Sequence, residues 1–141
     1  MTKAVQKTIS MPCDSRFLSE VRTLLNESLS QAQIPGKDKD LLILAVDEAA
    51  SSVVRYAKYK GFKSELTLTV DIDDVRFKAT LVDSINVFDL GRGLSATQME
   101  ERLAKEKTFT MGIFLIRRIM DEISYVYRKG FQNELEMIKF L

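Results

Sequence analysis

The side chains available for chemistry in this sequence are carboxylates, hydroxyls and one thiol. The chain has no histidine and a single cysteine, Cys13. Histidine-dependent nucleophilic triads, the common zinc sites and any internal disulfide are thereby excluded. Two pairs of adjacent carboxylates, Asp47–Glu48 and Asp73–Asp74, are the residues that an acid–base enzyme could use. Successive positions of a helix face different sides, and we expect the second pair to form a turn, so neither pair favours this interpretation.

Two further features allow more than one interpretation. Glu48 and Ser52 are four residues apart, which places them on the same face of a helix. Taken alone, this pair is also compatible with an ordinary polar helix edge. Cys13 precedes a predicted helix, where the pKa of a thiol can be lowered. The competing interpretation, a buried structural cysteine, is the more common one.

The elements that position these residues follow from the hydrophobic periodicity. Apolar residues at helical spacing predict helices from the N-cap Asp14 to about Gln31, from the N-cap Asp38 to about Lys58, and over 112–120. One apolar stripe is predicted along the second helix: Leu41, Leu44, Ala45, Ala49, Val53 and Tyr56. Alternation with a period of two predicts strands over 6–11, 65–70, 75–82, 123–128 and 135–140, with a hairpin turn at 71–74.

The order of these elements predicts the fold class. Helices that cluster in the sequence and strands joined mostly by hairpins indicate an α/β protein of the α+β type. We expect a two-layer sandwich, with a mixed, mostly antiparallel sheet and the helices on one face. The connection over about 86–110 is long for a compact domain and is predicted to be a lid, with a possible short helix at 96–105.

The composition narrows the class of protein. The length of 141 residues fits a single domain over 1–141, and the apolar fraction of 45% and charged fraction of 29% are typical of a globular protein. Lys and Arg total 21 against 20 Asp and Glu, so a nucleic-acid partner is not expected. The polar N-terminus and the short apolar run at 41–46 indicate neither a signal peptide nor a membrane span. A cytoplasmic protein is therefore expected.

Several segments together resemble the anti-sigma factor serine/threonine kinases, small members of the histidine kinase-like (GHKL) ATPase superfamily. The segment LAVDEAA at 44–50 resembles the start of a helical motif of that family, and GIFLIRRIMDE at 112–122 is similar to its later glycine-containing helix. Residues 17–25, the LVD at 81–83 followed by Phe88 and Asp89, and the last strand also match in order and spacing. The resemblance covers essentially the whole chain and implies the histidine kinase-like ATPase (Bergerat) fold.

The resemblance implies roles for two residues of the second helix. Glu48 matches the general base that acts on the hydroxyl to be phosphorylated. Ser52 stands where the family has an asparagine that holds Mg²⁺ against the triphosphate. A serine hydroxyl can ligate Mg²⁺, but it is shorter than the asparagine side chain and does not reach the same place.

The resemblance also implies a nucleotide site formed by the later segments. Asp83 matches the carboxylate that binds the adenine amine, while Ile85 stands where the family has a glycine that lets the backbone approach the base. Thr110 and Gly112 lie in the turn whose backbone amides hold phosphates, and only Gly112 keeps the glycine character of that turn. ATP and Mg²⁺ are thus the implied cofactors, with three altered elements in their site.

Two functions follow from the resemblance. The first is a regulatory protein that binds a sigma factor or a related target and is displaced by a STAS-type antagonist, with ATP binding impaired or lost. The second is an active ATP- and Mg²⁺-dependent kinase that phosphorylates this antagonist. The resemblance also implies a possible homodimer. The helix containing Phe17, Leu18 and Val21 could contribute to it, although core packing is the simpler role for these residues.

Overall fold

The computed structural model describes residues 4–60, 64–83, 110–128 and 132–141. In chain order, its elements are β1 (Val5–Pro12), the 3₁₀ turn η1 (Ser15–Phe17), α1 (Leu18–Gln31), α2 (Gly36–Lys60), β2 (Glu65–Ile72), β3 (Arg76–Asp83), α4 (Thr110–Ile119), β4 (Glu122–Arg128) and β5 (Gln132–Phe140). Residues 86–109 of the predicted lid and the short helix proposed at 96–105 lie outside the described residues, whereas the last predicted lid residue, Thr110, belongs to α4.

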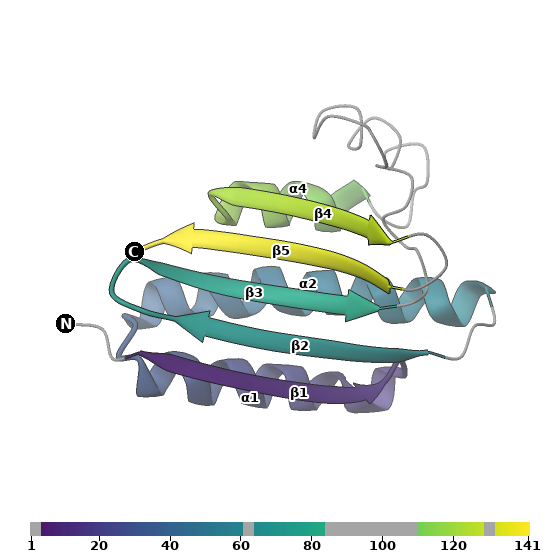
Figure 1. Cartoon of the computed structure of the whole chain (residues 1–141), viewed down its shortest axis with the longest axis horizontal. Coiled ribbons are helices and arrows are strands. Elements are labelled where there is room, and N and C mark those ends of the chain that lie inside the picture. Colours follow the sequence, from purple (N-terminus) through teal and green to yellow (C-terminus); the bar gives the residue numbers. More distant parts are fainter. Residues whose placement is uncertain (1–3, 61–63, 84–109, 129–131) are drawn as a thin grey trace.

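The strands form one five-stranded sheet in the order β1-β2-β3-β5-β4. All four neighbouring pairs are antiparallel, so the expectation of mostly antiparallel pairing is confirmed and no parallel pair occurs among these strands. The three α-helices lie on one face of the sheet, with α2 between α1 and α4 (Figure 1). The predicted α+β two-layer sandwich is therefore the observed architecture.

The core lies between the sheet and the helices. Side chains of β2 and β3 alternate between buried and partly exposed along each strand, as expected for a sheet with one covered face. Phe77, Leu68 and Leu81 are fully buried, and Leu68 is paired with Leu81 across the two strands. On α1, Val21 is buried, and Phe17 and Leu18 pack against the same cluster, so the start of this helix serves the core.

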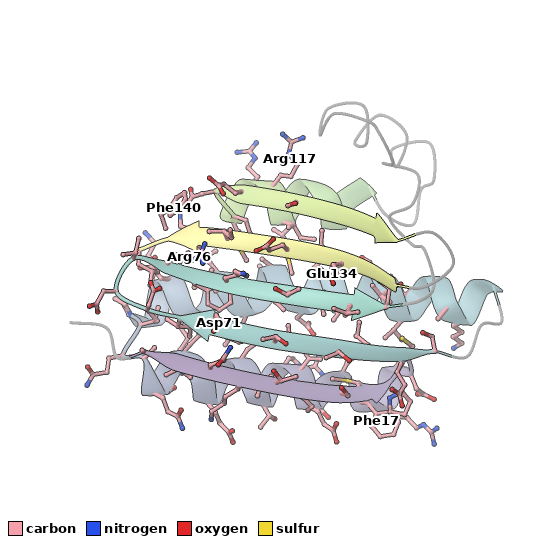
Figure 2. All side chains as sticks on the ribbon, viewed as in Figure 1. Phe17, Asp71, Arg76, Arg117, Glu134 and Phe140 are labelled. Carbon is pink, nitrogen blue, oxygen red and sulfur yellow. The ribbon has the colours of Figure 1, made fainter. Side chains whose placement is uncertain are left out.

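The uncovered face of the sheet is polar. Thr8 and Thr69 share a hydrogen bond of 3.1 Å between their hydroxyls, and Lys78 Nζ lies 2.9 Å from Glu136 Oε1. Asp71, Arg76 and Glu134 belong to the strands seen in front of the helices (Figure 2). Cross-strand hydroxyl and charge pairs of this kind stabilise a sheet face without requiring a cover.

The apolar stripe of α2 differs from the prediction. Ala45, Ala49 and Val53 are fully buried, but Leu41 and Leu44 are 41% and 46% exposed. The buried face is completed by residues that the predicted stripe omitted: Leu42, Val46, Ala50, Val54 and Ala57. The prediction was wrong for the first turns because α2 packs against α1, α4 and the sheet, and these neighbours bury a broader face than a single stripe.

The boundaries of several elements also differ. Asp14 does act as an N-cap, but of η1, since its side chain accepts a hydrogen bond from the Arg16 amide. α2 begins at Gly36, so Asp38 lies in its first turn and does not cap it. The hairpin turn is tighter than predicted: Asp73 Oδ1 accepts hydrogen bonds from the amides of Val75 and Arg76. This closure lets Asp71 and Ile72 remain in β2.

Candidate functional site

The middle of α2 brings Glu48 and Ser52 together. The Ser52 hydroxyl donates a hydrogen bond of 2.9 Å to the backbone carbonyl of Glu48, one turn earlier in the helix. Ser52 is 3% exposed and the Glu48 side chain 27%. The helical spacing therefore positions both predicted residues on one face, as expected, with the hydroxyl beneath the surface and the carboxylate above it.

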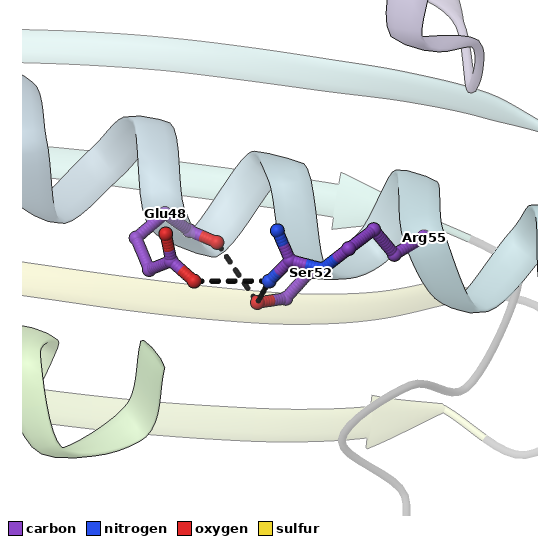
Figure 3. A network of polar contacts seen from close by, with 3 residues as sticks. All are labelled: Glu48, Ser52 and Arg55. Carbon is purple, nitrogen blue, oxygen red and sulfur yellow. Dashed lines mark hydrogen bonds and ion pairs between the residues drawn. The ribbon is translucent and has the colours of Figure 1, made fainter. Parts of the chain in front are cut away.

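Arg55 completes this site, and the sequence analysis did not identify it. Its Nη2 donates to Glu48 Oε1 at 2.9 Å and to Ser52 Oγ at 3.2 Å, so a single guanidinium nitrogen joins both residues (Figure 3). The signal was present in the sequence, since Arg55 follows Ser52 by three residues and Glu48 by seven on the same helix face. We call these three residues the α2 network.

The α2 network does not fit Mg²⁺. A ligand of Mg²⁺ must offer a lone pair at about 2.1 Å to a cation that demands near-octahedral geometry. The Ser52 hydroxyl donates its one hydrogen to a backbone carbonyl, and its oxygen accepts from Arg55. Glu48 Oε1 accepts from the same guanidinium. A divalent cation placed here would have to compete with Arg55 for both oxygens and would face its positive charge.

Asp83 lies at the end of β3 and is 4% exposed. Ser28, Ser52 and Asp83 are the polar residues that are buried in the described part of the chain, and two of them belong to the predicted site. A buried carboxylate retained at a strand end is uncommon without a role. As an acceptor of hydrogen bonds, it fits the amine of adenine in chemical type. Its assignment to adenine remains a prediction.

Cys13 lies close enough to Asp83 to be affected by its charge. Burial, followed by the negative charge of Asp83, raises the pKa of Cys13 to about 11. The suggestion of a thiol with a lowered pKa at a helix start is therefore wrong, because the thiol is half-buried beside a carboxylate and precedes only a short 3₁₀ turn. Cys13 also lines a cavity with Lys58 and Ser64 at the end of α2.

The remaining predicted nucleotide residues are only partly placed. Thr110 is the first residue of α4, and Gly112 lies in its first turn, next to α2 in the helical layer. Ile85 lies outside the described residues. The structure thus brings Glu48 and Ser52 together on α2, and the proximity of the other residues to them remains a prediction.

The side chain of Asp47 contacts α1, whereas that of its neighbour Glu48 contacts a residue of α2 itself. Its Oδ2 lies 3.5 Å from Arg22 Nη1 of α1. Its Oδ1 is buried and has no hydrogen-bond partner in the described part of the chain. Burial raises the pKa of Asp47, with the attraction of Arg22 acting in the opposite direction. The two carboxylates therefore serve different contacts, which argues against a catalytic pair.

Other classes of site find little support. The described residues contain no cluster of three or more histidine, cysteine, aspartate or glutamate side chains suited to a metal ion. Within the same ranges, no helix has the length and apolar character needed to cross a membrane.

Comparison with known proteins bears on the family and on the fold. The model of the family described as "Histidine kinase-like ATPase domain" matches residues 11–139. A serine-protein kinase RsbW of Staphylococcus epidermidis is 26% identical over 135 residues, which cover 93% of this chain and 84% of the relative. A serine-protein kinase RsbW of Listeria innocua is 25% identical over 127 residues, covering 87% and 80%.

Among solved structures, a chain of the SiaB–SiaC complex from Pseudomonas aeruginosa superposes with a TM-score of 0.71. The superposition covers 94% of this chain and 88% of that chain, at 15% sequence identity. At this identity the likeness concerns the fold.

Proposed function

The chain belongs to the histidine kinase-like ATPase domain family, and from this premise we propose that it is an anti-sigma-type regulatory protein of a partner-switching system. In this role it binds a sigma factor or a related target in the cytoplasm and releases it when a STAS-type antagonist binds. Its Mg²⁺-dependent use of ATP is impaired or lost. The similarity to serine-protein kinases named RsbW supports the choice of system, and the fold neighbour comes from a complex of two proteins.

The observation that carries this proposal is the engagement of Glu48 and Ser52 by Arg55. A carboxylate has to leave its ion pair before it can accept a proton from a substrate hydroxyl. Phosphoryl transfer in these folds also depends on a metal that neutralises the phosphates. The ion pair of Arg55 Nη2 with Glu48 Oε1 at 2.9 Å opposes the first requirement, and the contact of the same nitrogen with Ser52 opposes the second. Regulation by protein contact needs neither of them.

The alternative is an active ATP- and Mg²⁺-dependent kinase that phosphorylates the STAS-type antagonist. One observation favours it: Glu48 is kept on α2 and remains 27% exposed, within reach of a bound partner. In that case Glu48 exchanges Arg55 for the substrate hydroxyl when the partner binds. The two functions differ in whether the antagonist leaves the complex phosphorylated.

A binding and transfer experiment distinguishes the two functions. The purified chain is titrated with STAS-domain proteins of the same organism, in EDTA and in MgATP, and each mixture is then examined by mass spectrometry for phosphoserine and phosphothreonine. We expect binding of equal strength in both buffers and no phosphorylated antagonist. Glu48→Gln is the matched control and should bind equally well. Phosphorylation that Glu48→Gln abolishes would establish the kinase instead.

The same samples test the remaining partners. Competition by a sigma factor for the antagonist-bound chain would support partner switching, and light scattering reports whether the chain forms the homodimer that the family resemblance implies. The absence of binding to every STAS-domain protein and every sigma factor would contradict the proposal.

A further inference from the structure

We propose that Arg55 is a tethered cation that stands in place of a divalent metal ion on α2, so that this site binds phosphate anions without a metal. The proposal goes beyond the regulatory role above, because partner exchange does not require any anion to bind. In the α2 network the oxygens that could bind Mg²⁺ are engaged by Arg55, and the positive charge of Arg55 suits an anion.

The described hydrogen bonds of the Arg55 guanidinium use one of its three nitrogens, Nη2. Arginine carries five N–H donors in a planar fork that matches phosphate geometry. Within the described ranges, the hydrogen bonds of Arg55 go from Nη2 to Glu48 and Ser52. The second terminal nitrogen points away from both partners (Figure 3), and 44% of the side chain is exposed. An anion can therefore approach Arg55 from solvent while the guanidinium stays anchored.

The charge of this part of α2 also favours an anion. Residues 49–60 contain Arg55, Lys58 and Lys60 and no carboxylate. The two carboxylates just before them, Asp47 and Glu48, are each paired with an arginine. A phosphate chain near Arg55 would thus find further positive charge in the C-terminal part of the helix. It would compete with Glu48, the carboxylate that Arg55 contacts, while the charge of Asp47 also acts on Arg55.

Because Glu48 and phosphate compete for Arg55, substitutions of Arg55 and of Glu48 should change the affinity for phosphate in opposite directions. Removal of Arg55 takes away the cation, whereas removal of the negative charge of Glu48 frees it for a phosphate. A residue with a purely structural role would not produce a gain in one variant and a loss in the other. Arg55→Lys, which keeps the charge but not the fork, is expected to fall between the wild type and Arg55→Ala.

The experiment is calorimetric titration of inorganic tripolyphosphate into the full chain, in EDTA and in excess Mg²⁺, at low ionic strength. We expect the wild type to bind in EDTA at least as tightly as in Mg²⁺. Arg55→Ala should weaken binding in EDTA by about tenfold or more, and Glu48→Gln should tighten it by about threefold. Arg22→Ala is the matched control, since it removes another arginine paired with an α2 carboxylate, and it should leave the affinity unchanged.

Three results would overturn the proposal. These are no binding by the wild type in EDTA up to about 10 mM, tightening by Mg²⁺ of about tenfold or more, and equal affinities of the wild type and Arg55→Ala, with each variant shown to be folded by circular dichroism. The first and third results leave the regulatory function standing. The second would contradict both, because it would indicate a working metal site.

Discussion

Asp47 and Glu48 are neighbours in the sequence, yet each is paired with an arginine from a different direction. Arg22 comes from α1, across the helix interface, whereas Arg55 comes from two turns further along α2 itself. One contact therefore joins two helices, and the other closes over Ser52. The two adjacent carboxylates therefore have different direct partners, although the charges of Glu48 and Arg55 also act on Asp47.

The pH dependence of the free energy of unfolding should reflect the burial of the Asp47 carboxylate. Its pKa in the folded protein is raised above the ordinary 3.8, mainly by burial. An acid with a raised folded pKa stabilises the folded state at low pH, and this contribution is lost as the pH rises through the folded pKa. For Asp47→Asn, the free energy of unfolding relative to the wild type should therefore increase as the pH rises from about 3.5 to 7.

Urea denaturation at a series of pH values measures this difference. Asp73→Asn is the control of opposite sign, because hydrogen bonds from the amides of Val75 and Arg76 lower the pKa of Asp73. Its contribution is present above the unfolded pKa and is lost as the pH falls, so Asp73→Asn should become relatively less stable as the pH rises. A constant difference between Asp47→Asn and the wild type would show that the burial of Asp47 has no such cost.

At the scale of elements, α2 both fills the core and presents the site. Its inward face contains small residues such as Ala45 and Ala49, which allow it to lie close to the sheet and its neighbouring helices. Its outward face displays Leu41, Leu44 and then Glu48. A single helix thus fixes the position of the α2 network relative to the whole sheet.

The rotation of α2 about its axis can be tested with two adjacent leucines. Leu42 is 1% exposed and Leu41 is 41% exposed, and both have the same helix propensity. Leu42→Ala should lower the free energy of unfolding by about 2–5 kcal/mol because it leaves a cavity. Leu41→Ala should change it by less than about 1 kcal/mol. Urea denaturation of both variants is the measurement, and a larger loss for Leu41→Ala than for Leu42→Ala would place the buried face where the sequence had predicted it.

At the scale of the whole molecule, the open sheet face is polar and the helical layer carries the candidate site. The connection between β3 and α4 contains the segment predicted to be a lid, residues 86–110, and this assignment remains a prediction. In a kinase of this fold a lid would respond to the metal complex of ATP. In this chain Arg55 contacts the oxygens that the metal would use, so we expect that the segment does not distinguish ATP with Mg²⁺ from ATP without it.

Limited trypsin digestion tests this expectation. Cleavage after Arg92, Arg102, Lys105 or Lys107 should proceed at the same rate in MgATP as in ATP with EDTA. An unrelated unfolded substrate, digested in both buffers, controls for effects on the protease. Protection that appears only with MgATP would contradict the assignment of Arg55 as the replacement for the metal, and would favour the active kinase.

Most of the fold could be predicted from local patterns. Within the described residues, alternation with a period of two located the five strands and helical spacing located the three α-helices, because side-chain direction repeats every two residues in a strand and every 3.6 in a helix. The helical spacing also correctly placed Glu48 and Ser52 one turn apart on the same face of the helix. The start of α2 and the bounds of the hairpin turn were predicted incorrectly. Helix ends and turns depend on individual hydrogen bonds, such as those that Asp73 accepts, and periodicity does not reveal them.

The sequence by itself determined the fold family and which residues could meet within one helix. Only the tertiary structure decided which side of α2 is buried, that Arg22 of α1 reaches Asp47, and that Cys13 lies near Asp83, seventy positions away in the chain. It also selected the conformation in which Arg55 closes on Glu48. The physical reason is that spacing along a helix or strand fixes direction, whereas partners between elements, burial and the pKa shifts that follow from it depend on how those elements pack.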